Sequence, residues 1–146
     1  MCVDARANPT RPTRLADDEP LILIVEGNSV AAEALSRHLD RLGYRTDVAG
    51  SGATAIQAAI DRVPNLILLG SVLPDEDGLD VCQRLADAPQ TCLAPVIVLG
   101  EAGDAESVQR ARRAGGYFFL RKPYDPNALL VLIRHSLDEA TAWQES

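Results

Sequence analysis

The residues that most often carry chemistry in proteins are sparse in this sequence. The three cysteines, Cys2, Cys82 and Cys92, are odd in number and lack C-x-x-C spacing, so we expect neither a disulfide framework nor a zinc site. Neither His38 nor His135 has a nucleophile near it in a recognisable catalytic pattern. These observations predict a protein that is not an enzyme, and such cysteine usage suits the reducing cytoplasm.

Composition narrows the classes of partner. The 146 residues include 14 Lys and Arg against 21 Asp and Glu, which gives a formal net charge of −7. Proteins that bind nucleic acid present a basic surface to the phosphates, so direct nucleic-acid binding is not expected. No apolar run approaches the length of a membrane span, and no basic start leads into an apolar stretch, so we expect neither a membrane segment nor a secretory signal.

The elements that would position a site follow from the hydropathy pattern. Short apolar runs between turn residues predict strands that are buried on both faces. These runs are Leu21–Val25, Leu66–Leu69, Val96–Leu99 and Tyr117–Leu120. A fifth candidate, Arg45–Ala49, is more polar and therefore suits the edge of a sheet.

Helical patterns fill the intervals between these strands. The expected helices are Val30–Leu42, Gly52–Arg62, Gly78–Ala88, one that starts at Asp104 and runs through Ala114, and one that opens at Pro126 and reaches Ala140. In the first helix an apolar stripe, which we expect to face the core, consists of Ala31, Leu35, His38, Leu39 and Leu42.

Strands that alternate with helices predict right-handed crossovers and a parallel sheet covered on both faces. We therefore expect an α/β fold of the flavodoxin-like (βα)5 type, a three-layer sandwich whose five-stranded parallel sheet has the order 2-1-3-4-5. In that order ligands bind at the carboxyl ends of strands one and three. Those ends are Glu26–Gly27 and Gly70–Ser71. We expect a flexible N-terminal tail over 1–19, the folded domain over 20–140 and a short C-terminal tail over 141–146.

Four segments around the strands resemble the receiver domain of two-component response regulators. They read LILIVEGN at the first strand, NLILLGSVLPDEDG around the third, PVIVLGEAG at the fourth and FFLRKPYDP at the fifth. LPDEDG and KPY are quite specific in combination, and the resemblance covers nearly the whole folded part. It implies the fold described above and a role in phosphorelay signalling.

The resemblance also implies a chemistry. Receiver domains transfer a phosphoryl group to an aspartate at the end of the third strand, and acidic residues after the first strand hold Mg²⁺. A hydroxyl after the fourth strand and a lysine after the fifth meet the phosphoryl charge. Carried over by position, the acceptor is Gly70, the acidic pair is Glu26 and Gly27, the hydroxyl position is Gly100, and the lysine is Lys122.

This sequence therefore departs from the family in its chemistry. Glycine has no side chain, so Gly70 cannot attack phosphorus. Glu26 alone is a weak remnant of a metal site, and we expect Mg²⁺ binding to be weak or absent. Pro123 and Phe119 do match family positions. The resemblance predicts a degenerate receiver that needs no cofactor and is not phosphorylated on aspartate.

Two alternatives remain open. In one, Lys122 and backbone N–H groups at the three glycines form a pocket-based sensor for a small anion or a nucleotide phosphate. The competing interpretation of Lys122 is an ion pair with Glu26 or Glu101.

In the second alternative, an unconventional residue accepts the phosphoryl group. Ser71 is adjacent to Gly70, but alternation along a strand directs its side chain to the opposite face. Asp75 and Asp77 follow in the next loop, where aspartates commonly form turns and cap helices.

A docking surface remains useful without phosphorylation. In receivers, the face formed by the fourth helix, the fifth strand and the fifth helix commonly mediates dimerisation or partner binding. Here that face includes Arg110, Arg112, Arg113, Arg134 and Asp138. Mixed charges of this kind can form reciprocal bridges across a two-fold interface. We expect a phosphorylation-independent interaction domain that binds a protein partner or a second copy, with too few residues after the last helix for a DNA-binding domain.

Overall fold

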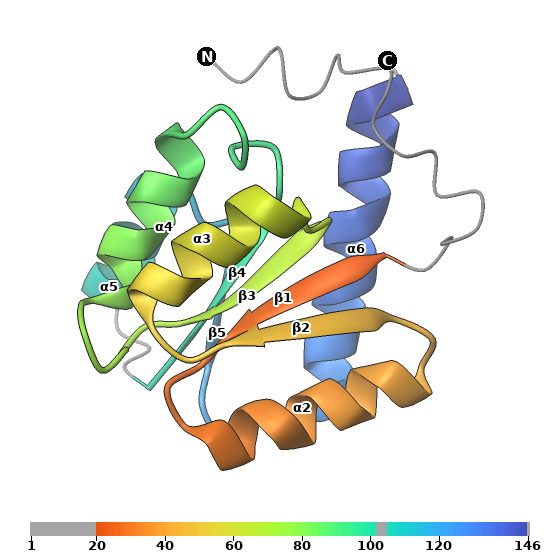
Figure 1. The fold of residues 1–146 in the computed structure, drawn as a ribbon, viewed down its shortest axis with the longest axis horizontal. Helices are drawn as coiled ribbons and strands as arrows, with labels where there is room; N and C mark the ends of the chain where they lie inside the picture. Colours follow the sequence, from red (N-terminus) through yellow and green to blue (C-terminus); the bar gives the residue numbers. More distant parts are fainter. Residues whose placement is uncertain (1–19, 102–104, 146) are drawn as a thin grey trace.

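The computed structural model describes the backbone of residues 20–101 and 105–145, and a parallel sheet runs through the middle of this part of the chain (Figure 1). Its strands are β1 (Leu21–Val25), β2 (Arg45–Ala49), β3 (Leu66–Gly70), β4 (Val96–Gly100) and β5 (Phe118–Arg121). The order is β2-β1-β3-β4-β5, and every neighbouring pair is parallel. The predicted fold class and strand order are confirmed.

Helices cover both faces of the sheet. They are α2 (Ser29–Arg41), α3 (Gly52–Arg62), α4 (Gly78–Asp87), α5 (Ala105–Arg113) and α6 (Pro126–Glu145). The expected N-terminal tail and the expected helix start at Asp104 lie outside the described residues. No helix in the described part of the chain combines the length and the apolarity that crossing a membrane requires.

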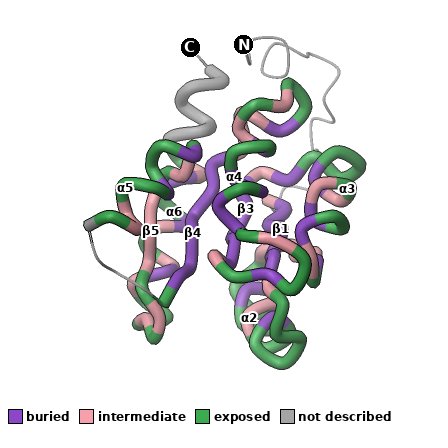
Figure 2. The backbone as a smooth tube through the Cα atoms, turned by 90° about the vertical axis from the view of Figure 1, so that its left-hand side faces the viewer, coloured by how far each residue is buried: buried purple, intermediate pink, exposed green. Residues whose placement is uncertain are grey.

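Alternation along the strands produces two separate cores. On β1, Leu23 and Val25 pack against α3, α4 and α5, whereas Ile22 and Ile24 pack against α2 and α6. The strands β1, β3 and β4 are buried on both faces, and Figure 2 shows them as the continuous purple centre of the molecule. Three of the four predicted apolar runs thus lie in the middle of the sheet, whereas the fourth forms β5 at an edge and is only half-buried.

Side-chain caps fix where the helices begin. Asn28 accepts hydrogen bonds from the first free N–H groups of α2, and Ser51 forms a capping box with Thr54 at α3. Asp77 caps α4, and the Asp125 side chain accepts a 3.0 Å hydrogen bond from an N–H in the first turn of α6. Because all the strands are parallel, the loops that carry these caps, after β1, β2, β3 and β5, lie at one edge of the sheet.

Two expectations about the helices are wrong. In α2 the buried residues are Ala32 and Leu39, whereas Ala31, His38 and Leu42 are exposed. The helix is rotated so that the line through Ala32 faces the sheet, and one edge of the predicted stripe faces outward. Helix α6 continues to Glu145 instead of giving way to a tail at residue 141, because no glycine or proline interrupts it there.

The cysteines occupy two different environments. Cys82 is free and lies in the core on α4, where burial raises the pKa of its thiol to about 11. Cys92 is half-buried in the segment before β4.

Candidate functional site

Backbone hydrogen bonds between neighbouring segments continue just past the carboxyl ends of β3, β4 and β5. The Ser71 N–H donates to the Leu99 carbonyl at 3.0 Å, and the Lys122 N–H donates to the Gly100 carbonyl at 2.7 Å. These bonds hold the residues after each strand in fixed positions at one edge of the sheet. The side chains that leave this edge form the candidate site.

An ion pair joins the ends of β1 and β5. The Lys122 Nζ lies 2.8 Å from the Glu26 Oε1, and the two side chains are 30% and 14% exposed. The second oxygen of Glu26 accepts a 3.2 Å hydrogen bond from the Asn28 N–H. This is one of the two pairings that the sequence predicts for Lys122. Both oxygens of the Glu26 carboxylate therefore have a protein donor.

Gly70 ends β3 directly beside this pair. Gly70 is buried, and a Cβ placed on it would lie 3.3 Å from the Val25 carbonyl oxygen and 3.4 Å from the Glu26 Oε1. The Glu26 carboxylate thus borders the space in which a side chain at residue 70 would begin. At this point the protein presents an ion pair, and residue 70 itself contributes no side-chain nucleophile.

Gly100 ends β4, and two neighbouring side chains fill the space above it. A Cβ on Gly100 would lie 2.7 Å from the Phe119 Cζ and 2.9 Å from the Ser71 Oγ. Phe119 is half-buried against the core that α3, α4 and α5 cover. The Ser71 hydroxyl therefore lies toward the end of β4, as strand alternation predicts, and not over Gly70.

Gly27 allows close packing between two loops. A Cβ on this residue would lie 2.9 Å from the Pro74 Cδ in the loop after β3. A side chain at residue 27 would therefore require that loop to shift. No local pattern of residues indicates this contact, because it joins segments that are far apart in the chain.

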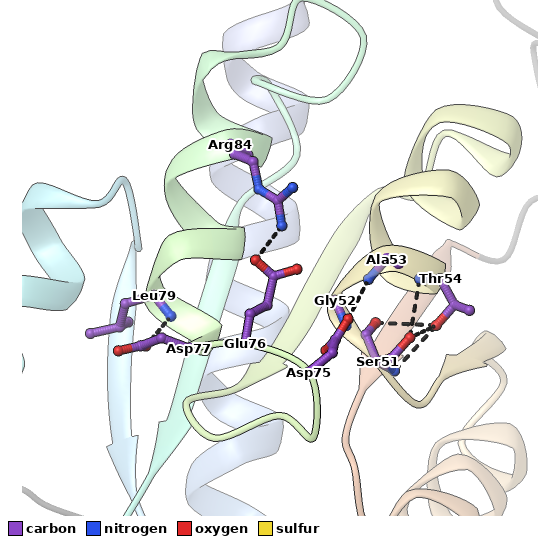
Figure 3. Close-up of polar contacts among 9 residues, drawn as sticks. All are labelled: Ser51, Gly52, Ala53, Thr54, Asp75, Glu76, Asp77, Leu79 and Arg84. Carbon is purple, nitrogen blue, oxygen red and sulfur yellow. Dashed lines mark hydrogen bonds and ion pairs between the residues drawn. The ribbon is translucent and has the colours of Figure 1, made fainter.

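Asp75, which follows Pro74, caps α3, the helix that precedes β3 in the chain. The Asp75 carboxylate accepts hydrogen bonds from the Gly52 N–H at 2.8 Å and the Ala53 N–H at 3.1 Å, at the start of α3 (Figure 3). The Gly52 N–H is the main cause of the lowered pKa of Asp75. The predicted capping role is confirmed, although the capped helix is α3 and not α4.

The other two acidic residues of this loop also have structural partners. Asp77 caps α4 by accepting the Leu79 N–H at 2.8 Å, and it pairs with Arg110 on α5 at 3.2 Å. Glu76 forms an ion pair with Arg84 in the last turn of α4 (Figure 3). The loop is therefore held to three helices by its carboxylates.

The predicted docking residues lie on two helices of the β5 edge. Helix α5 carries Arg110, Arg112 and Arg113, and α6 carries Arg134 and Asp138; all five are exposed. Arg110 is tied to Asp77, and Arg113 donates a 3.1 Å hydrogen bond to Gln109. The two helices cover opposite faces of the sheet at β5, because α5 packs with Phe119 and α6 packs with Phe118 and Leu120.

Sequence reasoning missed a cavity that opens beside the ion pair. It has a volume of about 590 Å³ and is lined by Glu26, Lys122, Glu101 and Tyr124 together with apolar residues of β1, β4 and α2. Desolvation raises the pKa of Tyr124, and the negative charge of Glu26 raises it further. The one available signal was Tyr124 itself, a large aromatic residue directly after the Lys-Pro motif.

Comparison with known proteins agrees with this geometry. The sequence matches the family described as response regulator receiver domain over residues 22–134. It is 31% identical over 115 residues to the DNA-binding dual master transcriptional regulator RpaA of Synechocystis, which covers 79% of this chain and 48% of that protein. It is 31% identical over 125 residues to the transcriptional regulatory protein KdpE of Mycobacterium tuberculosis, which covers 86% and 54%.

Solved structures with the same fold include receiver domains of other signalling proteins. The signal receiver domain of a histidine kinase from Syntrophus aciditrophicus is 30% identical with a TM-score of 0.76, and it covers 82% of this chain and 91% of that one. The signal receiver domain of a diguanylate cyclase from Desulfovibrio desulfuricans is 31% identical with a TM-score of 0.75, over 86% and 98%. The chain spans about half the length of the curated relatives it matches. With the family match, these similarities establish that the chain belongs to the receiver-domain family of two-component response regulators.

Proposed function

We propose that this receiver domain acts without aspartyl phosphorylation, as a protein-interaction domain in two-component signalling. The main support is the environment of Gly70, which occupies the acceptor position by resemblance and has no side chain. The nearest carboxylate, that of Glu26, is held by Lys122 at 2.8 Å and by the Asn28 N–H at 3.2 Å. The lysine that would meet phosphoryl charge therefore already neutralises a protein carboxylate.

The same residues are a poor fit to magnesium. Mg²⁺ requires octahedral oxygen coordination and is usually bound through one or two carboxylates together with substrate phosphate. Within residues 20–101 and 105–145, no three His, Cys, Asp or Glu side chains gather into a group that could hold a metal ion. Glu26 offers a carboxylate that is already paired, and Gly27 and Gly70 offer none. The proposal therefore includes no step that uses Mg²⁺.

The nearby candidates for an unconventional acceptor have other roles. Asp75 caps α3, and Asp77 caps α4 and pairs with Arg110. The Ser71 hydroxyl lies toward Gly100, on the opposite side of β3 from Glu26. These contacts support an interaction role over transfer to a substitute residue.

Intact-mass spectrometry tests the proposal. The chain is incubated with acetyl phosphate and Mg²⁺, and separately with a histidine kinase, beside a phosphorylatable receiver that shows both donors to be active. We expect no adduct of about 80 Da on this chain. A stable adduct mapped to the mouth between β1 and β3 would overturn the proposal, and its position would identify the substitute acceptor.

A further inference from the structure

A second cavity continues the one beside the ion pair. It has a volume of about 350 Å³ and lies between α2 and α6, and the two cavities share Ala31, Leu35 and Tyr124 in their linings. Helices α2 and α6 cover the same face of the sheet (Figure 1). The shared residues indicate one elongated groove that runs from the carboxyl edge of the sheet along these two helices.

The two ends of this groove differ in chemistry. The end at the sheet edge contains Glu26, Glu101 and Lys122, whereas the far end is formed mainly by apolar residues of α2 and α6, such as Leu129 and Leu130. The exposed part of the α2 stripe, which includes Ala31, faces this groove. An apolar helix stripe that the described part of the chain leaves uncovered is a surface that a ligand can bury.

The charges at the polar end favour a cation. Two carboxylates and one ammonium line this end, and Lys122 is already paired with Glu26, so Glu101 adds an excess negative charge. Tyr124 contributes an aromatic ring to the lining, and such rings attract cations. An anion would meet a neutralised lysine and the exposed carboxylate of Glu101, so the charges do not support the anion sensor that the sequence left open.

We propose that the groove between α2 and α6 binds a small amphiphilic molecule with a cationic head, such as an organic ammonium. The head lies by Glu101 and Tyr124, and the alkyl or aromatic body lies along Ala31 and Leu35. A volume of about 590 Å³ is within the range of small-molecule sites, which are mostly apolar with a few placed polar groups. This site shares helix α6 with the interaction face, because Leu130 in its lining lies one turn before Arg134, and it needs no phosphorylation.

Three probes with the same tail and different heads test the site. Octylammonium, octanol and octanoate are titrated into the ¹⁵N-labelled chain at neutral pH, and amide shifts are followed by NMR. We expect saturable shifts at Ala31, Leu35 and Tyr124, with octylammonium binding about fivefold more tightly than octanoate. Equal or tighter binding of octanoate, or no saturable shift with any probe, would overturn the proposal.

Two substitutions separate the location from the charge. Ala31→Leu places a larger side chain in the groove and should weaken all three probes. Ala53→Leu makes the same change at an exposed position of α3, across the sheet, and should leave binding unchanged. Glu101→Gln should remove the preference for octylammonium over octanoate and leave octanol unchanged. The amide spectrum shows whether each variant is folded, and unchanged binding in Ala31→Leu would contradict the assigned location.

Discussion

At the scale of single residues, the glycines differ in what surrounds them. Gly78 begins α4, its N–H donates a 2.9 Å hydrogen bond to the Ser71 carbonyl, and a Cβ on it would collide with the Gly70 carbonyl oxygen. Gly50 has open space where its side chain would be. The backbone of the loop after β3 therefore packs against the end of β3 so closely that residue 78 has no room for a side chain.

Gly78→Ala should destabilise the fold, and Gly50→Ala should not. The collision at residue 78 is with backbone atoms, which cannot rotate away, so we expect a loss of about 1–3 kcal/mol in the free energy of unfolding. The change at residue 50 should be within about 0.5 kcal/mol of the wild-type value. Equilibrium urea unfolding measures both variants. Similar midpoints for the two would contradict the packing described for the end of β3.

The glycine at residue 100 controls the position of an aromatic ring. Because a Cβ there would lie 2.7 Å from the Phe119 Cζ, the half-buried position of Phe119 depends on the absence of a side chain at residue 100. Gly100 offers no hydroxyl to which the ring of Phe119 could couple. The structure adds that the ring itself occupies the space that such a hydroxyl group would need.

At the scale of elements, Asp75 connects the loop after β3 to the start of α3. Its carboxylate accepts the Gly52 and Ala53 N–H groups, which have no acceptor within the helix. A negative charge at a helix N-terminus is also favoured by the helix dipole. The loop that carries the acidic motif is therefore part of the capping of a neighbouring helix.

Asp75→Asn should lower stability near neutral pH and have less effect in acid. The hydrogen bonds from α3 lower the pKa of Asp75 in the folded state. A lowered folded-state pKa means that the stabilisation is present above the ordinary pKa of the carboxyl and is lost as the pH falls through the lowered value. Urea midpoints of wild type and variant, measured from pH 7 to pH 2, should converge at the acid end. A difference that stays constant over this range would contradict the role of the charge.

The elements themselves were predictable because their signals are local. Buried runs such as Leu66–Leu69 and caps such as Ser51 act within a few residues, and both are read directly from the sequence. The rotation of α2 was not predictable, because residues 31 and 32 are both alanine and hydropathy does not distinguish them. The groove depends on how α2 and α6 are placed over the sheet. That placement arises from tertiary packing and is not encoded in the pattern of either helix.

The candidate site was predictable only where strand order and local motifs place its residues. The topology alone placed Glu26 and Gly70 at one edge, and the resemblance added Lys122. The contact of Asp75 with α3 joins residues that are 23 positions apart. The contact of Pro74 with Gly27 also joins two loops that are distant in the sequence. Such contacts follow from the assembled fold, so local motifs could not reveal them.

At the scale of the whole molecule, charge is unevenly distributed. The chain has a formal net charge of −7, yet α5 carries three arginines in its last turn. A basic patch on an acidic protein favours an acidic partner surface and speeds the encounter with it. This contrast supports docking through the face formed by α5, β5 and α6.

Charge reversal on α5 should therefore weaken docking without changing the fold. Arg112 is the appropriate residue because it is exposed, whereas Arg110 and Arg113 hold local contacts with Asp77 and Gln109. We expect Arg112→Glu to reduce the recovery of proteins captured from native lysate, and to reduce any self-association seen by sedimentation velocity. The loss should be larger at low salt, because exposed charges are screened as ionic strength rises.

A matched reversal on α2 provides the control. Arg37 is also exposed, and it pairs with Glu33 at 3.5 Å on the opposite face of the sheet. Arg37→Glu makes the same change in net charge, so a general effect of charge would weaken capture equally in both variants. A loss specific to Arg112→Glu would assign docking to α5. Equal recovery from wild type and both variants would mean that this face is not the interaction surface of the domain.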